Sequence, residues 1–280
     1  MRELRCTQIS ETVARLFTEA NFDLPVDVMA ALHKAASEET SPQARRILET
    51  LIRNAEIAAG KRVAMCQDCG LAIVFAELGR DCHLDGDLYA AIDEGVRQAY
   101  SAGYLRKSAL ANPLQRNSNT GDNTPAIVHL RLVEGDRLTL HAAPKGGGSE
   151  NMSALWMLSP SVGRQGVIDS IVERIKHAGG KPCPPLVLGV GLGGTFEKAA
   201  LLAKHSLLRP LGQPGATTEI SDLERELLEQ VNATGIGPMG MGGRTTALAV
   251  HVETHPCHIA SLPVALNVQC HSARHKTAII

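Results

Sequence analysis

Two thiols, an amide and a carboxylate stand within the stretch Cys66-Gln67-Asp68-Cys69-Gly70, directly before the apolar run Leu71–Phe75. Thiolates bind soft metals and a carboxylate moves protons, so this stretch combines metal binding with acid–base chemistry. A C-x-x-C by itself also fits a redox pair, half of a zinc site, or two small buried residues. Two later cysteines, Cys183 and Cys270, stand in stretches punctuated by proline or glycine, and they add further candidate ligands.

The cysteine spacing argues against a local zinc knuckle, because Cys66, Cys183 and Cys270 lie far apart along the chain. Three distant thiolates can instead hold three irons of a [4Fe–4S] cluster and leave the fourth iron open as a Lewis acid. The chain has seven cysteines in all, an odd number that argues against a disulfide framework. Cys69 is either a further ligand or a small residue beside the site. The remaining cysteines are predicted to be structural: Cys6, Cys82 and Cys257.

An open iron needs partners that bind carboxylates and move protons. Asp68 and His258 are the candidates for acid–base work, and Arg106 is a candidate bidentate clamp for a carboxylate. The three glycines at 146–148 leave backbone N–H groups free to form a nest for an anion, the alternative being a flexible surface loop.

The composition is that of a soluble globular protein, with 280 residues, 44% hydrophobic and 20% charged. A net charge of −1 and an aromatic content of 3% give no basis for a nucleic-acid or membrane surface. No signal peptide is visible, and no apolar run approaches the roughly 20 residues of a membrane helix. We therefore expect a cytoplasmic protein.

The hydrophobic pattern predicts an α/β (mixed α+β) fold. Residues 8–60 are predicted to be helical, and further helices are expected at 85–102, 162–178, 195–205 and 217–231. Alternating residues at 128–132 and 138–142 predict a hairpin. Buried strands are expected at 72–75, 185–190, 245–252 and 259–268. We predict a single compact cluster-binding domain over 1–280, with two lobes as the alternative.

Two other interpretations compete with a hydro-lyase. Gly189, Gly191 and Gly194 fit the G-x-G-x-x-G of a nicotinamide dehydrogenase, but no strand ending in an acidic residue follows about 20 residues later. The second alternative is a non-catalytic metal-binding or assembly module, against which the polar loop around Arg106 and the acid beside Cys66 argue.

Four motifs in order resemble the α subunit of the iron–sulfur (class I) fumarate hydratases, shared with L-tartrate dehydratase. The resemblance covers about residues 10–275. The motifs are Cys66-Gln-Asp-x-Gly70, Lys145-Gly-Gly-Gly-Ser-Glu-Asn151, Cys183-Pro-Pro with Gly189-Val-Gly-Leu-Gly-Gly-Thr195, and Ser261-Leu-Pro-Val-Ala-Leu-Asn-x-Gln-Cys270.

The resemblance implies a [4Fe–4S] cluster held by Cys66, Cys183 and Cys270, with one iron not ligated by cysteine. It implies substrate contacts from Gln67, Asp68, Arg106, His258 and a glycine at 147 or 148, most simply Gly148. Family members usually have threonine where Cys69 stands.

The implied reaction is reversible hydration of fumarate to L-malate, a step of the tricarboxylic acid cycle; the alternative substrate is L-tartrate or a related C4 hydroxy-dicarboxylate. The glycine loops at 145–151 and 236–243 resemble fumarate hydratases more than tartrate dehydratases. The family's other domain is missing here, so the resemblance implies a separate β subunit in an α2β2 heterotetramer.

Overall fold

The computed structural model describes residues 2–280, and the chain divides into two compact units. Unit 1 contains the chain up to Pro25, then Asn54–Gly147 and Arg274–Ile280. Unit 2 contains Val26–Arg53 and Gly148–Ala273. Both units combine helices with β-sheet, so the predicted α/β class is confirmed.

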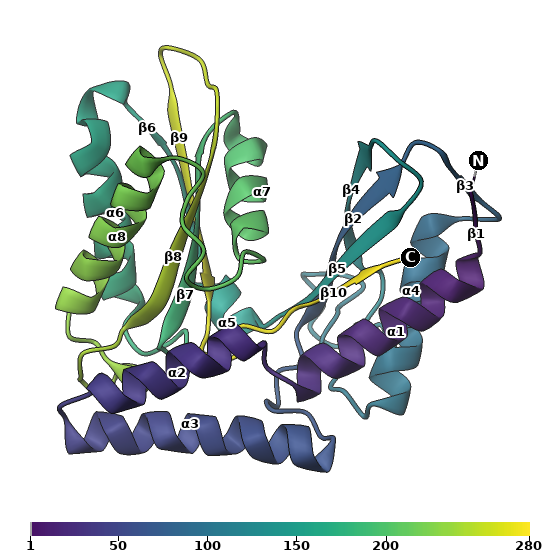
Figure 1. Ribbon diagram of the computed structural model, residues 1–280, viewed down its shortest axis with the longest axis horizontal. Helices are drawn as coiled ribbons and strands as arrows, with labels where there is room; N and C mark the ends of the chain where they lie inside the picture. Colours follow the sequence, from purple (N-terminus) through teal and green to yellow (C-terminus); the bar gives the residue numbers. More distant parts are fainter. Residues whose placement is uncertain (1) are drawn as a thin grey trace. The chain divides into compact units, whose positions relative to one another are not determined.

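Unit 1 is a four-stranded sheet covered by two helices (Figure 1). The helix α1 (Cys6–Phe22) packs against α4 (Leu88–Ala102) and against strands β5 (Leu138–Lys145) and β10 (Lys276–Ile279) of the sheet. The apolar face of α1 is fully buried, including Ile9, Val13 and Phe17, as its helical period predicts. The elements are α1 (Cys6–Phe22), α4 (Leu88–Ala102) and the sheet in the order β10 (Lys276–Ile279), β5 (Leu138–Lys145), β2 (Leu71–Gly79), β4 (Ile127–Val133); β1 (Arg2–Leu4) and β3 (Cys82–Leu84) form a separate parallel pair.

The predicted hairpin of residues 128–132 and 138–142 is wrong, because β2 lies between these strands. Strand β4 pairs with β2 in parallel and β5 pairs with β2 antiparallel. The strand predicted at 72–75 is longer than expected, since β2 runs from Leu71 to Gly79; it is an inner strand of the sheet and buries both of its faces. Strand β4 is at the sheet edge and stays largely exposed, including Leu130 and Leu132 on the apolar face that the alternation predicts to be buried.

Unit 2 has a second four-stranded sheet, with helices on both faces (Figure 1). Helix α7 (Phe196–Ser206) covers one face and packs on three strands of the sheet, while α6 (Gly163–Ala178) and α8 (Thr218–Ala233) lie together over the other face. The sheet order is β6 (Ala154–Leu158), β9 (Leu262–Gln269), β7 (Leu186–Gly193), β8 (Ala247–His255); the helices are α6 (Gly163–Ala178), α7 (Phe196–Ser206) and α8 (Thr218–Ala233), with the short turns η1 (Pro160–Val162) and η2 (Pro238–Gly240).

The predicted helical region at 8–60 is confirmed, since α1 is followed by α2 (Val26–Glu38) and α3 (Pro42–Lys61). The short helix α5 (Gly147–Glu150) forms within the predicted glycine loop, where the chain passes from unit 1 to unit 2. Within residues 2–280, no helix is both long and apolar enough to cross a membrane.

Candidate functional site

The loop Cys66–Gly70 connects α3 to the central strand β2 of unit 1. Its last residue, Gly70, has φ +77, and a Cβ there would lie 2.6 Å from the backbone nitrogen of Lys145. This close approach arises because Leu71 of β2 is paired with Lys145 of β5. The strand pairing therefore brings the cysteine motif beside the start of the glycine motif, and only glycine fits at the contact.

Buried polar side chains hold the carbonyl groups of this loop. The Tyr100 hydroxyl lies 2.7 Å from the carbonyl oxygen of Cys69 and 2.9 Å from that of Gly70. The Asn123 amide donates to the Gly70 carbonyl at 3.1 Å. Both side chains are buried, and burial raises the pKa of Tyr100, so its hydroxyl remains a hydrogen-bond donor.

The carboxylate of Asp68 accepts hydrogen bonds from its own loop and from the glycine motif. The Gly70 N–H donates to Oδ1 at 2.9 Å and the Gly147 N–H donates to Oδ2 at 2.7 Å. The main-chain carbonyl of Asp68 accepts from Arg274 Nη2 at 2.8 Å. One N–H of the glycine motif, that of Gly147, is therefore directed at the Asp68 carboxylate.

The two sulfurs of the loop differ in exposure. Cys69 is buried, its Sγ accepts the Arg106 N–H at 3.2 Å, and burial raises the pKa of its thiol. Cys66 is partly exposed, and its Sγ accepts the Asp68 N–H at 3.4 Å. This geometry favours Cys66 as the ligand and Cys69 as a small residue that positions Arg106, whose side chain, like that of Gln67, is exposed.

The polar loop that begins at Arg106 is held in place by Asn123. The Oδ1 atom of Asn123 accepts the N–H groups of Ser108 and Ala109 at 2.7 and 3.1 Å. Since its Nδ2 binds Gly70, one buried amide joins the loop of Arg106 to the cysteine loop.

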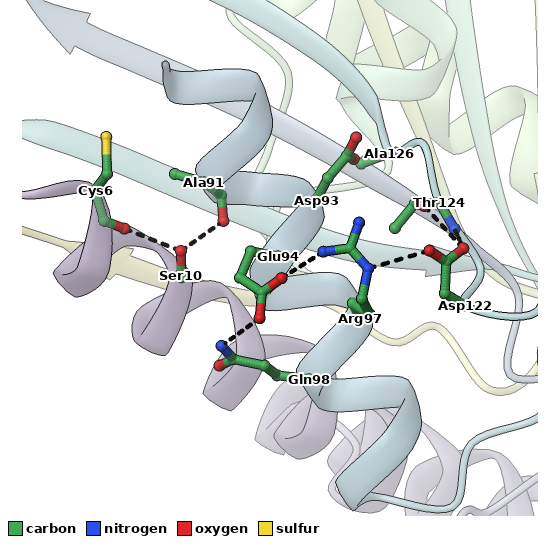
Figure 2. Close-up of polar contacts among 10 residues, drawn as sticks. All are labelled: Cys6, Ser10, Ala91, Asp93, Glu94, Arg97, Gln98, Asp122, Thr124 and Ala126. Atoms are coloured by element: carbon green, nitrogen blue, oxygen red, sulfur yellow. Dashed lines mark hydrogen bonds and ion pairs between the residues drawn. The ribbon is translucent and has the colours of Figure 1, made fainter. Parts of the chain in front are cut away.

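Asp122 anchors the same polar loop to helix α4 (Figure 2). Arg97 of α4 donates from Nε to Asp122 at 3.1 Å and also pairs with Glu94. The backbone N–H of Thr124, together with its hydroxyl and Arg97, lowers the pKa of Asp122 to about 2, outweighing the effect of desolvation. The loop that presents Arg106 is therefore ordered by hydrogen bonds at its far end as well.

In unit 2, Cys183 and Cys270 lie at the same end of the two inner strands β7 and β9. The register pairs Val187 at the start of β7 with Gln269 at the end of β9. Cys183 precedes β7 and Cys270 follows β9, and the His271 N–H donates to the Cys183 carbonyl at 3.2 Å. Both cysteines are partly exposed, and neither forms a disulfide.

Two glycine motifs lie close to this end of the sheet in unit 2. The Met239 N–H, from the glycine loop at 235–243, donates to the Pro184 carbonyl at 2.8 Å. A Cβ on Gly148 would lie 3.8 Å from the carbonyl of Lys181, close in sequence to Cys183. The predicted contact residue Gly148 is thus next to the cysteine loop of unit 2.

His258 is not brought to these cysteines. It lies in the connection before β9, whereas Cys270 follows β9. The eight residues of β9 span about 26 Å at about 3.3 Å per residue. His258 instead lines a cavity of about 680 Å³ between the starts of α6 and α8, at the opposite end of the sheet. The local sequence carries no information about this separation.

The G-x-G-x-x-G glycines have a packing role. A Cβ on Gly189 or Gly191 would overlap the backbone carbonyls of Ala203 or Ala199 in α7. The chain continues from α7 to α8 without an intervening strand, unlike a dinucleotide-binding βαβ unit. These glycines therefore allow close helix–sheet contact.

The three predicted cluster ligands are divided between the units. Cys66 belongs to unit 1, and Cys183 and Cys270 belong to unit 2. Among residues 2–280, the side chains of His, Cys, Asp and Glu form no group of three or more placed to hold a metal. The donor set is chemically suitable for an iron–sulfur cluster, because the three cysteines form no disulfide and are partly accessible in irregular loops.

Sequence reasoning missed the residues that position the loop. Tyr100, Asn123 and Arg274 are buried and polar, and each contacts Cys66–Gly70 from a distant segment. Tyr100 occupies a position of the apolar face of α4, and Arg274 stands in an aperiodic tail. No local pattern distinguishes either from an ordinary core or surface residue.

The comparisons with known proteins identify the family. The family model "Fumarate hydratase (Fumerase)" matches residues 10–279, and the chain belongs to this family. A protein of Methanocaldococcus jannaschii named "Putative L(+)-tartrate dehydratase subunit alpha" is 44% identical over 274 residues, covering 95% of each chain. The L(+)-tartrate dehydratase subunit alpha of Escherichia coli O157:H7 is 29% identical over 275 residues, covering 98% of this chain and 91% of its own.

Proposed function

We propose that this chain is the α subunit of a [4Fe–4S]-dependent hydro-lyase that removes water from a C4 hydroxy-dicarboxylate, with L-tartrate as the preferred substrate. The observation that carries the proposal is the loop Cys66–Gly70, in which an accessible sulfur, a hydrogen-bonded carboxylate and the segment of Arg106 are held together. The names of the relatives support tartrate over fumarate, reversing the preference drawn from the glycine loops.

Cys66, Cys183 and Cys270 are the proposed cluster ligands. A bound cluster with one iron not ligated by cysteine would supply a Lewis acid for the substrate hydroxyl. The thiolates of the chain fit this role because they are soft donors outside regular elements and none is disulfide-bonded.

The remaining residues bind the substrate and move a proton. Loss of water breaks a C–O bond at one carbon and a C–H bond at its neighbour, and we assign the proton released from carbon to the carboxylate of Asp68. The N–H groups of Gly70 and Gly147 orient that carboxylate. Arg106 would bind a substrate carboxylate through two parallel N–H groups, with Gln67 and the N–H of Gly148 as further donors.

The proposal leaves His258 out of a site made by the cysteines of the same chain, because the whole length of β9 separates it from Cys270. Fumarate hydration to L-malate is the second candidate activity, which the family model supports. We further propose that the chain acts in the cytoplasm with a separate β subunit, as an α2β2 assembly; the word "subunit" in the relatives' names supports a partner chain.

The test is anaerobic reconstitution, followed by iron and sulfide analysis and kinetics with L-tartrate and L-malate after co-expression with the β chain. We expect about four irons and four sulfides per α chain. Cys66→Ser should lose the cluster, whereas the matched variant Cys69→Ser should retain it. Asp68→Asn should keep the cluster spectrum and reduce kcat by at least about 100-fold, the range of a general acid–base.

Each part of the proposal can fail separately. Full iron in Cys66→Ser removes that residue from the ligand set. An unchanged kcat in Asp68→Asn removes the acid–base assignment. A kcat/KM higher for malate than for tartrate returns the substrate to the fumarate–malate pair.

A further inference from the structure

Arg274 is a buried arginine whose role the proposed chemistry has not used. It stands just before β10 in unit 1, and only 2% of its surface is exposed. Arginine is almost never buried to this extent unless it is paired with other groups. Its environment therefore indicates a specific function.

The guanidinium joins two segments that lie far apart in the sequence. Nη1 donates to Asn21 Oδ1 at 2.9 Å, and Nη2 donates to the Asp68 carbonyl at 2.8 Å. Asn21 lies in the last turn of α1 and is itself buried, and its carbonyl accepts the Met65 N–H at 3.0 Å. Asn21 thus holds the residue before the cysteine loop, and Arg274 holds the centre of the loop against Asn21.

The charge of Arg274 is incompletely compensated by these contacts. Both acceptors are neutral oxygens, and the buried Nε has no hydrogen-bond partner. A Cβ placed on Gly146 would lie 3.1 Å from Asp68 Oδ2 and 3.9 Å from Arg274 Nη2, so the carboxylate and the guanidinium approach the same point. A buried cation is stabilised by nearby negative charge, and the carboxylate of Asp68 in the cysteine loop supplies such a charge here.

We propose that Arg274 is a positioning residue for the Cys66–Gly70 loop and the fixed positive charge that balances the anionic group bound there. The anionic group is the thiolate-held cluster with its dicarboxylate substrate, and this part rests on the proposed function. The placement of Asp68 by Arg274 rests on the hydrogen bonds alone.

Two substitutions separate geometry from charge. Arg274→Lys keeps the charge but replaces the planar fork by a single ammonium, which cannot make both hydrogen bonds in the same arrangement. Arg274→Met removes the charge as well. Arg209→Lys is the matched control, because Arg209 is another largely buried arginine with an unpartnered Nε, paired with Glu224 in unit 2.

The first measurement is amide hydrogen exchange in the full chain. The N–H groups of Asp68 and Gly70 are hydrogen-bonded within the loop and report its rigidity. We expect both Arg274 variants to raise exchange at these amides at least tenfold, while Arg209→Lys leaves them unchanged. Equal exchange rates in Arg274→Lys and Arg209→Lys would overturn the positioning role. Because Arg274→Lys retains the positive charge, a faster exchange in this variant reports the lost hydrogen-bond geometry and not a lost charge.

The second measurement is the midpoint potential of the reconstituted cluster. A nearby positive charge favours the reduced, more negative form, so Arg274→Met should lower the potential, whereas Arg274→Lys should keep it. An unchanged potential in Arg274→Met overturns the charge role. Arg274→Gln is the neutral substitute if the methionine variant does not fold.

The two proposals fail in distinguishable ways. A wild-type chain that takes up no iron with its partner refutes the proposed function and the charge role that depends on it. The exchange comparison then still decides whether Arg274 positions Asp68.

Discussion

Tyr100→Phe tests whether hydrogen bonds from a buried side chain hold the loop Cys66–Gly70 in its conformation. The substitution removes one hydroxyl and keeps the aromatic ring, which is 1% exposed and lies near the ring of Phe17. Packing is preserved, so any effect comes from the lost hydrogen bonds to the carbonyls of Cys69 and Gly70.

The magnitude follows from which carbonyl is left without a partner. The Gly70 carbonyl still accepts from Asn123 at 3.1 Å, whereas the Cys69 carbonyl loses the donor that the structure provides. Leaving one buried acceptor unsatisfied costs about 1–3 kcal/mol. At about 2–4 °C per kcal/mol for a chain of this size, the expected decrease in Tm is about 5 °C.

Differential scanning calorimetry of the cluster-free chain gives the measurement, and Tyr104→Phe is the matched control because that tyrosine is 94% exposed. Should the two units melt separately, the decrease is expected only in the transition that includes α4. A Tyr100→Phe protein as stable as Tyr104→Phe, with unchanged amide exchange at Gly70, would refute the idea that the hydroxyl holds the loop.

Two further predictions concern packing and pH. Gly191→Ala should destabilise unit 2 by at least about 2 kcal/mol through overlap with the Ala199 carbonyl, whereas Gly60→Ala, with open space in α3, should be neutral or stabilising in urea unfolding. The depressed pKa of Asp122 means that its stabilising contacts are complete above the unfolded pKa near 3.8 and are lost as the pH falls toward about 2. Asp122→Asn should therefore lower the free energy of unfolding at pH 7 by no more than about 1 kcal/mol, given the partial exposure of Asp122, and the difference from wild type should shrink by pH 2.5. An equal difference at both pH values would contradict this assignment.

The sequence alone determined most of the helices and the identity of the chemical groups. Helices α1, α3, α4, α6 and α8 follow from apolar residues at helical spacing and from capping residues such as Asp87 and Thr217, whose side chains accept N–H groups of the first turn. These are local signals, since a helix forms its hydrogen bonds within its own segment. The cysteine and glycine motifs were equally visible, because their chemistry resides in residue type.

Only the tertiary structure decided which segments meet. Strand β2 separates β4 from β5, although the alternation in both predicted a hairpin; a strand's pattern gives its buried face and not its partner. The same pairing brings Gly70 to Lys145 and allows Gly147 to bind Asp68. Arg274, after the last long strand, binds the Asp68 carbonyl in the loop. The length of β9 separates His258 from Cys270. Such contacts depend on long-range packing, which no window of sequence contains.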